Sequence, residues 1–278
     1  LEEALAGVLA DCPPKLAAAL RYSVFPGGAR LRPKLCLAVA WACGEDEPRV
    51  VDGAAAAIEL LHCASLVHDD LPCFDNADER RGKPSVHKVY GEQLAVLSGD
   101  ALIVLAFEAL AKGAARAPHR LAALSTIVSR ATGAAGGICA GQAWECEPEV
   151  DVSRYHRAKT GALFSAATMA GAAACSVTYE PWRALGELVG EAYQVADDIR
   201  DVVCNAESLG KPVGVDEALM RPSACRELGL QGAIDKLNNL VERAVDSIPQ
   251  CPRVQELRGL VRQEALRFLP EELAQAAA

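Results

Sequence analysis

Two groups of aspartates dominate the chemistry of this sequence, and each follows an apolar stretch with helical spacing. The groups are Asp69, Asp70 and Asp75, and then Asp197, Asp198 and Asp201. Carboxylates at the end of a buried helix are costly unless cations neutralise them, and Mg²⁺ prefers oxygen ligands of this kind. A single Asp pair is more often a solvated helix end. Two such clusters favour a site in which Mg²⁺ ions hold a diphosphate.

Helical geometry relates the members of the second cluster. Positions i, i+1 and i+4 lie at about 0°, 100° and 40° around a helix of about 3.6 residues per turn. The three carboxylates therefore share a face, and Gln194, three residues earlier, falls on that face too. If the two clusters face each other across a cavity, they hold the ions and one diphosphate between them.

Basic residues stand close to the first cluster. Arg80 and Arg81 precede Gly82, and adjacent guanidinium groups suit forked contacts to phosphate oxygens. Upstream, a Gly27-Gly28 turn leads into Arg30 and Arg32 near a helix start, where free N–H groups also attract anions. For the Arg80 and Arg81 motif, a plain surface turn is the alternative.

His62 lies seven residues before Asp69, a rotation of about −20°, so both side chains share one helix face. A lone His in an apolar helix is usually a core residue. Its alignment with the aspartates predicts contact with a phosphate or with the substrate.

Composition indicates the fold that must position these residues. Of 278 residues, 51% are hydrophobic but only 5% are aromatic, which is a helix-forming mixture rich in Ala, Leu and Val. The net charge of −9 and the pI of about 5.2 argue against a nucleic-acid partner. The 11 cysteines form no C-x-x-C pair and no zinc-type spacing, so we expect a reduced, cytoplasmic protein.

Apolar residues recur at three- and four-residue spacing almost throughout, and no alternating run is long enough to predict a strand. Proline and glycine breaks divide the chain into about ten or more helices, and no charged linker separates two cores. We therefore expect an all-α fold with a single domain over residues 1–278 around a central cavity. The uncharged stretch 160–179 is rich in Ala and Gly, and we expect a buried helix there rather than a membrane span.

Taken together, the motifs resemble the trans-isoprenyl diphosphate synthases, and the likeness covers nearly the whole chain. It looks closest to the geranylgeranyl diphosphate synthases of carotenoid and bacteriochlorophyll pathways in photosynthetic bacteria. The matching segments are GGARLRP at 27–33, HDDLPCFD at 68–75, ERRGKP at 79–84, GDAL at 99–102, GGICAGQAWE at 136–145, KTGALF at 159–164, YQVADDIRD at 193–201 and LGKPVG at 209–214. The ordered set is highly specific.

The resemblance implies a helical isoprenoid synthase bundle, a homodimer, and condensation of isopentenyl diphosphate with dimethylallyl, geranyl or farnesyl diphosphate. It implies Mg²⁺, three ions per site with Mn²⁺ as a substitute, on the six aspartates named above. The residues expected to hold the allylic diphosphate or face its cation are Arg80, Lys159, Thr160, Gln194 and Lys211. The residues expected to bind isopentenyl diphosphate are Arg30, Arg32, His62 and Arg81.

Ala64 and Ser65 are expected to set the product length. They lie one turn before Asp69, about 6–8 Å along the helix axis, where the growing hydrocarbon must pass. Farnesyl-producing relatives often place a bulky aromatic where this chain has Ala64, so a small residue predicts geranylgeranyl diphosphate. The alternatives are a farnesyl diphosphate synthase, a class I terpene cyclase and a non-catalytic prenyltransferase subunit. Two intact aspartate clusters argue against the last two.

Overall fold

The computed structural model describes residues 1–25, 27–149, 154–155, 157–203 and 223–267. Twelve α-helices occur in these ranges, so the prediction of an all-α fold with about ten or more helices is confirmed. They are α1 (Glu2–Leu9), α2 (Pro14–Val24), α3 (Leu31–Cys43), α4 (Pro48–Asp69), α5 (Val86–Tyr90), α6 (Glu92–Gly113), α7 (Leu121–Thr132), α8 (Ile138–Ala143), α10 (Ala162–Ala174), α11 (Arg183–Val203), α14 (Ala224–Asp246) and α15 (Val254–Leu266).

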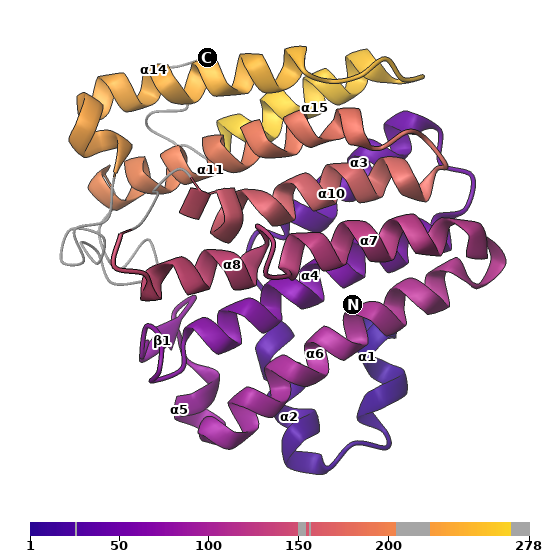
Figure 1. Ribbon diagram of the computed structural model, residues 1–278, viewed down its shortest axis with the longest axis vertical. Coiled ribbons are helices and arrows are strands. Elements are labelled where there is room, and N and C mark those ends of the chain that lie inside the picture. Colours follow the sequence, from indigo (N-terminus) through magenta and orange to yellow (C-terminus); the bar gives the residue numbers. More distant parts are fainter. Residues whose placement is uncertain (26, 150–153, 156, 204–222, 268–278) are drawn as a thin grey trace.

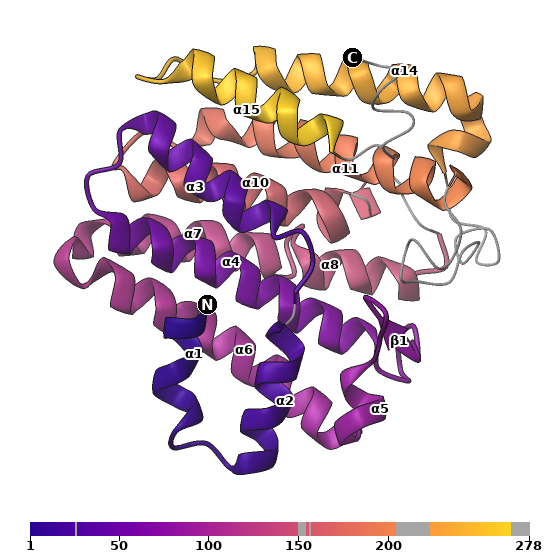
Figure 2. The same cartoon turned by 180° about the vertical axis from the view of Figure 1, so that it is seen from behind.

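The helices form stacked layers (Figures 1 and 2). Helices α14 and α15 cover one end of the molecule, and α1, α2 and α5 lie at the other. Helices α3, α4, α7, α8, α10 and α11 run between these ends, so the two segments that carry the aspartate clusters, α4 and α11, belong to the middle of the bundle. The fold therefore brings residues far apart in sequence into one central region.

Glycines allow α4 and α6 to pack closely. A Cβ atom added at Gly53 would lie 2.7 Å from the carbonyl oxygen of Ala109, and one at Gly113 would lie 2.6 Å from that of Arg49. Toward the other end of the contact, a Cβ at Gly99 would overlap the His68 ring, at 2.0 Å from Nε2. Helix α4 is thus fixed against α6 along most of its length, which sets the position of the aspartates at its C-terminal end.

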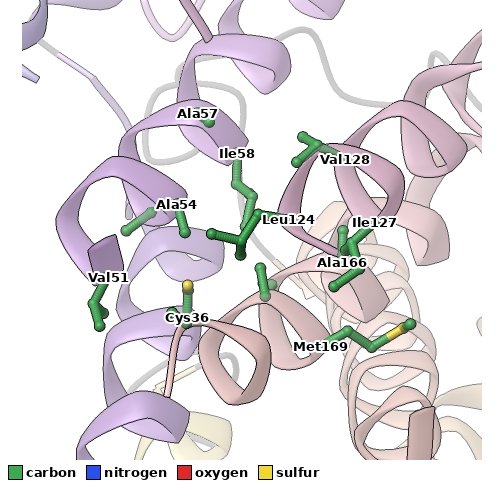
Figure 3. Close-up of a cluster of buried hydrophobic side chains, with 14 of the residues drawn as sticks. Cys36, Val51, Ala54, Ala57, Ile58, Leu124, Ile127, Val128, Ala166 and Met169 are labelled. Atoms are coloured by element: carbon green, nitrogen blue, oxygen red, sulfur yellow. The ribbon is translucent and has the colours of Figure 1, made fainter. Parts of the chain in front are cut away.

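The core between α4, α7 and α10 is built from aliphatic and small side chains (Figure 3). Ile58 of α4 and Leu124 of α7 are fully buried, and so is Ala167 of α10. Every α10 residue from Leu163 to Ala174 is buried, so the prediction of a buried helix within 160–179 is confirmed. Small side chains on α10 let the neighbouring backbones approach closely: a Cβ at Gly171 would lie 2.5 Å from the carbonyl oxygen of Cys36.

Two described helices are long and apolar enough to span a membrane by length and composition alone. They are Pro48–Asp69, with a mean hydropathy of 1.6, and Glu92–Arg116, with a mean hydropathy of 2.0. The first is 67% buried as the central core helix, whereas the second is only 39% buried. Helix α6 therefore has an exposed apolar side.

A short hairpin departs from the expectation that no strands form. Strand β1 (Glu79–Arg80) pairs antiparallel with β2 (Lys83–Pro84). The two turn residues, Arg81 and Gly82, both have positive φ values, 57° and 70°. Positive φ at both central positions is the geometry of a tight two-residue hairpin turn, which a glycine at the second position favours. The turn chemistry forms the hairpin where no alternating apolar pattern predicts one.

Arg120 joins three segments of the bundle just before α7. It donates to both carboxylate oxygens of Asp46, at 2.8 and 2.6 Å, and to the carbonyl oxygen of Ala174 at 2.7 Å. We expect Arg120→Ala to lower the free energy of unfolding by about 2–3 kcal/mol, because it leaves a buried carbonyl without its donor. Urea denaturation measures the difference. Arg116→Ala, an exposed neighbour, is the control and should change little.

The effect of Arg120 should depend on pH. The hydrogen bond from Arg120 lowers the pKa of Asp46 from its ordinary value. Stability from this pair is therefore fully present above the pKa of an unfolded Asp, about 3.9, and is lost as the pH falls through the lower folded value. The gap in unfolding free energy between wild type and Arg120→Ala should be wide at pH 7 and narrower at an acidic pH below the lowered pKa of Asp46. An equal gap at both pH values would contradict this role of Asp46.

Candidate active site

The first aspartate cluster forms where α4 ends. Asp69 is the last residue of the helix and Asp70 is its C-terminal cap. The loop then folds back on the helix end, because the backbone N–H of Asp75 donates to the carbonyl of Asp69 at 2.9 Å and that of Ala77 donates to the carbonyl of Asp70 at 3.2 Å. This local fold brings Asp75 next to Asp69 despite the five intervening residues. Asp70 is buried, whereas Asp75 is exposed.

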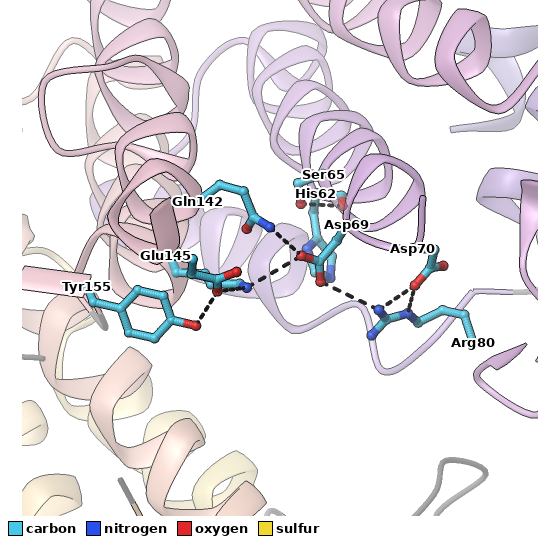
Figure 4. A network of polar contacts seen from close by, with 9 residues as sticks. His62, Ser65, Asp69, Asp70, Arg80, Gln142, Glu145 and Tyr155 are labelled. Carbon is cyan, nitrogen blue, oxygen red and sulfur yellow. Dashed lines mark hydrogen bonds and ion pairs between the residues drawn. The ribbon is translucent and has the colours of Figure 1, made fainter. Parts of the chain in front are cut away.

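Cations and an amide surround the first cluster (Figure 4). Arg80 Nε donates to Asp70 Oδ1 at 2.8 Å, and Arg80 also lies 3.5 Å from Asp69. Lys159 Nζ lies 3.4 Å from Asp69 Oδ1, and Gln142 Nε2 donates to the same oxygen at 3.0 Å. The positive groups expected to hold a diphosphate thus stand directly beside the proposed metal ligands.

Burial and neighbouring charges shift the pKa values of two groups in this cluster, Asp70 and Lys159. Burial raises the pKa of Asp70, and Arg80 offsets only part of that rise. Burial also opposes the charged form of Lys159, yet Asp69 and Glu145 together raise the pKa of Lys159 above its ordinary value. Lys159 therefore stays an ammonium at neutral pH, as a phosphate contact requires.

The second cluster lies on α11, where Gln194 contacts one of its three aspartates. Gln194 Nε2 donates to Asp198 Oδ1 at 3.3 Å, and Thr160 Oγ1 donates to Gln194 Oε1 at 3.5 Å. Arg200 pairs with Asp197 at 2.8 Å, and Asp201 is partly exposed. Thr160, Gln194 and Asp198 border a cleft of about 580 Å³.

Asp198 also has a role in the fold. The side chain of Asp198 is almost completely buried. Its second carboxylate oxygen accepts a hydrogen bond at 2.7 Å from the backbone N–H of Ala224, the first residue of α14. Asp198 thus satisfies a free N–H group at the start of a helix, as a capping carboxylate does. Substituting it is expected to affect the docking of α14 as well as any metal.

Among the described residues, no group of three or more His, Cys, Asp or Glu side chains is close enough together to hold one metal ion. The donor set still fits Mg²⁺, because it consists of carboxylate oxygens with amide oxygens nearby. The two clusters would have to share an ion through a bridging phosphate. That arrangement remains a prediction.

A second cationic group, Arg32 of α3 and Arg81 of the hairpin turn, meets His62 of α4 below the aspartates. Arg32 and Arg81 each direct a terminal nitrogen at His62 Nε2, at 3.3 and 3.4 Å. Burial, together with these guanidinium groups, lowers the pKa of His62 well below its ordinary value. The imidazole is therefore neutral and accepts rather than donates at this nitrogen. Arg32 also lies over the Phe164 ring, 4.3 Å from its centre.

Neither Arg32 nor Arg81 pairs with a carboxylate within the described ranges, and Arg32 Nε is buried without a hydrogen-bond partner there. Burial lowers the pKa of Arg32, which shows that its charge is poorly compensated. Gly28 lies against the Arg81 guanidinium, where an added Cβ would be 2.9 Å from Cζ. The glycine turn, Arg32, Arg81 and His62 are thus brought together in the fold, and isopentenyl diphosphate binding by this group stays a prediction.

Arg30 differs from the sequence expectation. Its φ of 53° lies in the left-handed region, and its guanidinium donates to the buried carboxylate of Glu59 and to the carbonyl of Val24. Arg30 therefore ties the glycine turn to α4, and these contacts do not point to a substrate. The signal was present in the sequence, because Glu59 is an acid within an apolar run, three residues before His62 on the same helix.

Three side chains at the site were given no role from sequence. Gln142 contacts Asp69, and Glu145 accepts from both Lys159 and Tyr155. The first two lie in the motif GGICAGQAWE, but their partners come from segments distant in sequence. Lys211, expected at the allylic diphosphate, lies outside the described residues.

The positions expected to set product length lie one turn below Asp69. Ala64 is 1% exposed and belongs to the main core, so a larger side chain there would meet packed neighbours. Ser65 is partly exposed and donates to the carbonyl of His62 at 2.9 Å. Both are placed as expected on the helix that carries the aspartates.

Comparison with known proteins identifies this arrangement. Residues 13–257 match the family model described as polyprenyl synthetase. The chain belongs to the polyprenyl synthetase family. It is 54% identical to a geranylgeranyl diphosphate synthase of Cereibacter sphaeroides over 99% of this chain and 97% of that protein. It is 53% identical to one of Rhodobacter capsulatus, over 94% and 90% of the two chains.

Solved structures of the polyprenyl synthetase type share the fold. A geranyltransferase from Helicobacter pylori, complexed with magnesium and isoprenyl diphosphate, matches with a TM-score of 0.79 and 32% identity over 95% of each chain. A geranylgeranyl pyrophosphate synthetase from Pyrococcus horikoshii matches with a TM-score of 0.73 and 28% identity, over 94% of this chain and 93% of that one. The expected isoprenoid synthase fold, and the resemblance to the enzymes of photosynthetic bacteria, are confirmed.

Proposed function

We propose that this polyprenyl synthetase condenses isopentenyl diphosphate with allylic diphosphates and releases geranylgeranyl diphosphate. One observation supports the proposal: two separate groups of cationic side chains lie against one face of α4. Asp69, with Arg80 and Lys159, forms the first, and His62, with Arg32 and Arg81, forms the second. Seven residues of helix separate Asp69 from His62, which is about 10 Å. Two diphosphates can therefore lie side by side.

The residues suit ionisation followed by condensation. Arg80 and Lys159 hold the allylic diphosphate, and bound Mg²⁺ would supply the additional charge that stabilises this group as it leaves. The oxygen atoms of Thr160 and Gln194 lie close together and would face the positive charge that develops on the allylic carbon. Arg32 and Arg81 hold isopentenyl diphosphate so that its double bond forms the new C–C bond. The proton lost in the last step passes to the released diphosphate.

The relatives support geranylgeranyl diphosphate as the product, because both bacterial proteins above carry that name. A farnesyl diphosphate synthase is the second candidate, since several structural neighbours are named geranyltransferases. Ala64 favours the longer product, because it is small and lies one turn below Asp69. A non-catalytic subunit is disfavoured by the two intact aspartate clusters.

The test is incubation of the purified protein with Mg²⁺, farnesyl diphosphate and labelled isopentenyl diphosphate, followed by chromatography of the dephosphorylated products. We expect a C20 alcohol. A product from geranyl diphosphate that stops at C15 would make the protein a farnesyl diphosphate synthase. No product from any allylic primer would contradict the proposal.

The proposal extends to a homodimer formed through α6. The exposed face of this helix carries large apolar side chains at helical spacing: Val96, Leu97, Ile103, Val104 and Phe107. These side chains lie about one and two turns apart, so they form an apolar stripe, which the exposed Asp100 interrupts. A stripe of this kind on a helix that is otherwise fixed against α4 fits the same stripe on a second copy, as a two-fold interface requires.

Val104→Glu should convert the dimer to monomer, because Val104 is the most exposed of these side chains at 66% and a buried, unpaired carboxylate opposes association. Sedimentation velocity measures the change. Leu228→Glu, at an equally apolar and half-exposed position on α14, is the matched control and should leave the dimer intact. A wild-type protein that sediments as a monomer at micromolar concentration would contradict the interface.

The remaining expectations complete the proposal. Mg²⁺ is supported by the magnesium in the Helicobacter pylori relative, whereas three ions per site and replacement by Mn²⁺ are expected from the resemblance. We also propose that residues 1–278 form a single domain and that the protein is cytoplasmic.

A further inference from the structure

Lys159 stands between two carboxylates at unequal distances. Its Nζ is 2.6 Å from Glu145 Oε1 but 3.4 Å from Asp69 Oδ1. The hydroxyl of Tyr155 donates to the same Glu145 oxygen at 2.7 Å. The side chains of Lys159 and Glu145 are 21% and 29% exposed, so water screens the pair in part. The closer partner of Lys159 is therefore Glu145, and the proposed metal ligand is the more distant one.

Backbone packing creates this geometry. Glu145 lies in a 3₁₀ turn, Trp144–Cys146, that follows α8, and Lys159 lies in a single turn of π-helix, Arg157–Gly161. A Cβ added at Gly141 would lie 2.5 Å from the backbone nitrogen of Lys159, so a glycine is needed for the two segments to touch. Glu145 follows Gly141 by about one helical turn and consequently faces the Lys159 side chain. A π-helical turn is a frequent feature of functional sites.

We propose that Glu145, supported by Tyr155, is a positioning residue that keeps the Lys159 ammonium from closing onto Asp69. An ammonium has three donors and no fixed plane, so it moves toward whichever carboxylate attracts it most. With Glu145 in place, one donor is held away from Asp69, which stays accessible to Mg²⁺. The other donors are then free to meet the diphosphate. This inference rests on the proposed function, because it concerns the same allylic site.

Removing the charge of Glu145 should shift Lys159 onto Asp69, where it competes with the metal. Outer partners of metal-site residues typically contribute about 10–100-fold to metal affinity or activity. Glu145→Gln should therefore lower kcat by about 10–100-fold and raise the Mg²⁺ concentration needed for half-maximal rate. The KM for isopentenyl diphosphate should not change, because the Arg32 and Arg81 site is separate. A general loss of structure would change both kcat and the KM for isopentenyl diphosphate.

Three further variants separate the effect of the Glu145 charge from other effects of substitution. Glu145→Asp keeps the charge and should recover most of the activity lost in Glu145→Gln. Tyr155→Phe keeps the carboxylate but removes its supporting hydroxyl, so the loss should be smaller and in the same direction. Glu147→Gln, an exposed acid two residues further on, is the control and should match wild type. Equal losses in the Gln and Asp variants would contradict a role for the charge.

The decisive experiment is isothermal titration of inorganic diphosphate into the protein with Mg²⁺ present, for wild type, Glu145→Gln, Lys159→Met and the double variant. We expect Glu145→Gln to weaken binding about tenfold in the wild-type background and not at all in Lys159→Met, because Glu145 acts through Lys159. Circular dichroism confirms that each variant is folded.

Two outcomes would overturn the inference. In the first, the Glu145→Gln variant binds diphosphate as tightly as wild type, or the substitution weakens diphosphate binding equally in the wild-type and Lys159→Met backgrounds. Either result would show that Glu145 does not act through Lys159, and it would leave the proposed prenyl transfer unaffected. In the second, the wild-type protein itself does not bind Mg²⁺ and diphosphate. The proposed function then fails, and the positioning role of Glu145 fails with it.

Discussion

Asp69→Ala is expected to lower kcat/KM for the allylic diphosphate by about 10³-fold or more. Asp69 is the point where the carboxylate cluster, Lys159, Arg80 and Gln142 meet. Loss of a metal ligand beside a departing diphosphate removes several kcal/mol of transition-state stabilisation, and each 1.4 kcal/mol is about tenfold in rate. Steady-state kinetics with farnesyl and isopentenyl diphosphates measures the loss.

The matched control is Asp78→Ala in the same loop. Asp78 is 82% exposed at its side chain and pairs with Lys88 at 2.8 Å, away from the site. It should keep near-wild-type activity. Asp69→Asn, which keeps the shape of the side chain, should lose nearly as much as Asp69→Ala, because the charge is what the metal requires. Near-normal turnover in Asp69→Ala, or full activity in excess chelator, would contradict the assignment.

Ala64→Tyr is expected to change the main product from the C20 to the C15 diphosphate. Ala64 lies five residues before Asp69, so the hydrocarbon that extends along α4 from the bound diphosphate passes it early. A phenol at this position would close the path before the fourth isoprene unit is added. Chromatography of the dephosphorylated products separates farnesol from geranylgeraniol.

Core packing is the alternative explanation that this experiment must address. Ala64 is 1% exposed, and overpacking a core usually costs about 1–3 kcal/mol. Circular dichroism and thermal melting therefore accompany the assay, and Ala64→Ser, with almost no added volume, should keep the C20 product. A folded Ala64→Tyr protein that still makes only geranylgeraniol would place the end of the hydrocarbon tunnel elsewhere.

Much of the fold follows from local sequence rules. Helical spacing and Pro or Gly breaks predict where α4, α10 and α11 form, because apolar periodicity decides which face is buried. The metal-type clusters follow as well, since Asp197 and Asp198 repeat the pattern of Asp69 and Asp70 at the end of an apolar run. In both cases neighbours along the chain carry the information.

Contacts between segments that are distant in sequence could not be predicted from local sequence patterns. Arg30 was expected to bind substrate, but tertiary packing gives it the buried Glu59 as its partner. Glu145 and Lys159 are fourteen residues apart, and their pairing depends on the close approach at Gly141. Pair distances of this kind are set by the packing of whole helices, and no local pattern encodes them. The Arg81 and Gly82 turn was missed for a different reason, because a two-residue hairpin has no apolar alternation to detect.

The central claim is that the two aspartate clusters close on one metal-bound diphosphate. Crystals grown with diphosphate and Mn²⁺ in place of Mg²⁺ test it most directly, since anomalous diffraction locates the Mn²⁺ ions. We predict ions bridged by the diphosphate within about 2.0–2.3 Å of oxygens from Asp69 on one side and Asp197 on the other, with Arg80 and Lys159 turned to the phosphate. A bound diphosphate with Mn²⁺ away from both clusters, while Asp69 stays paired with Lys159, would contradict the claim.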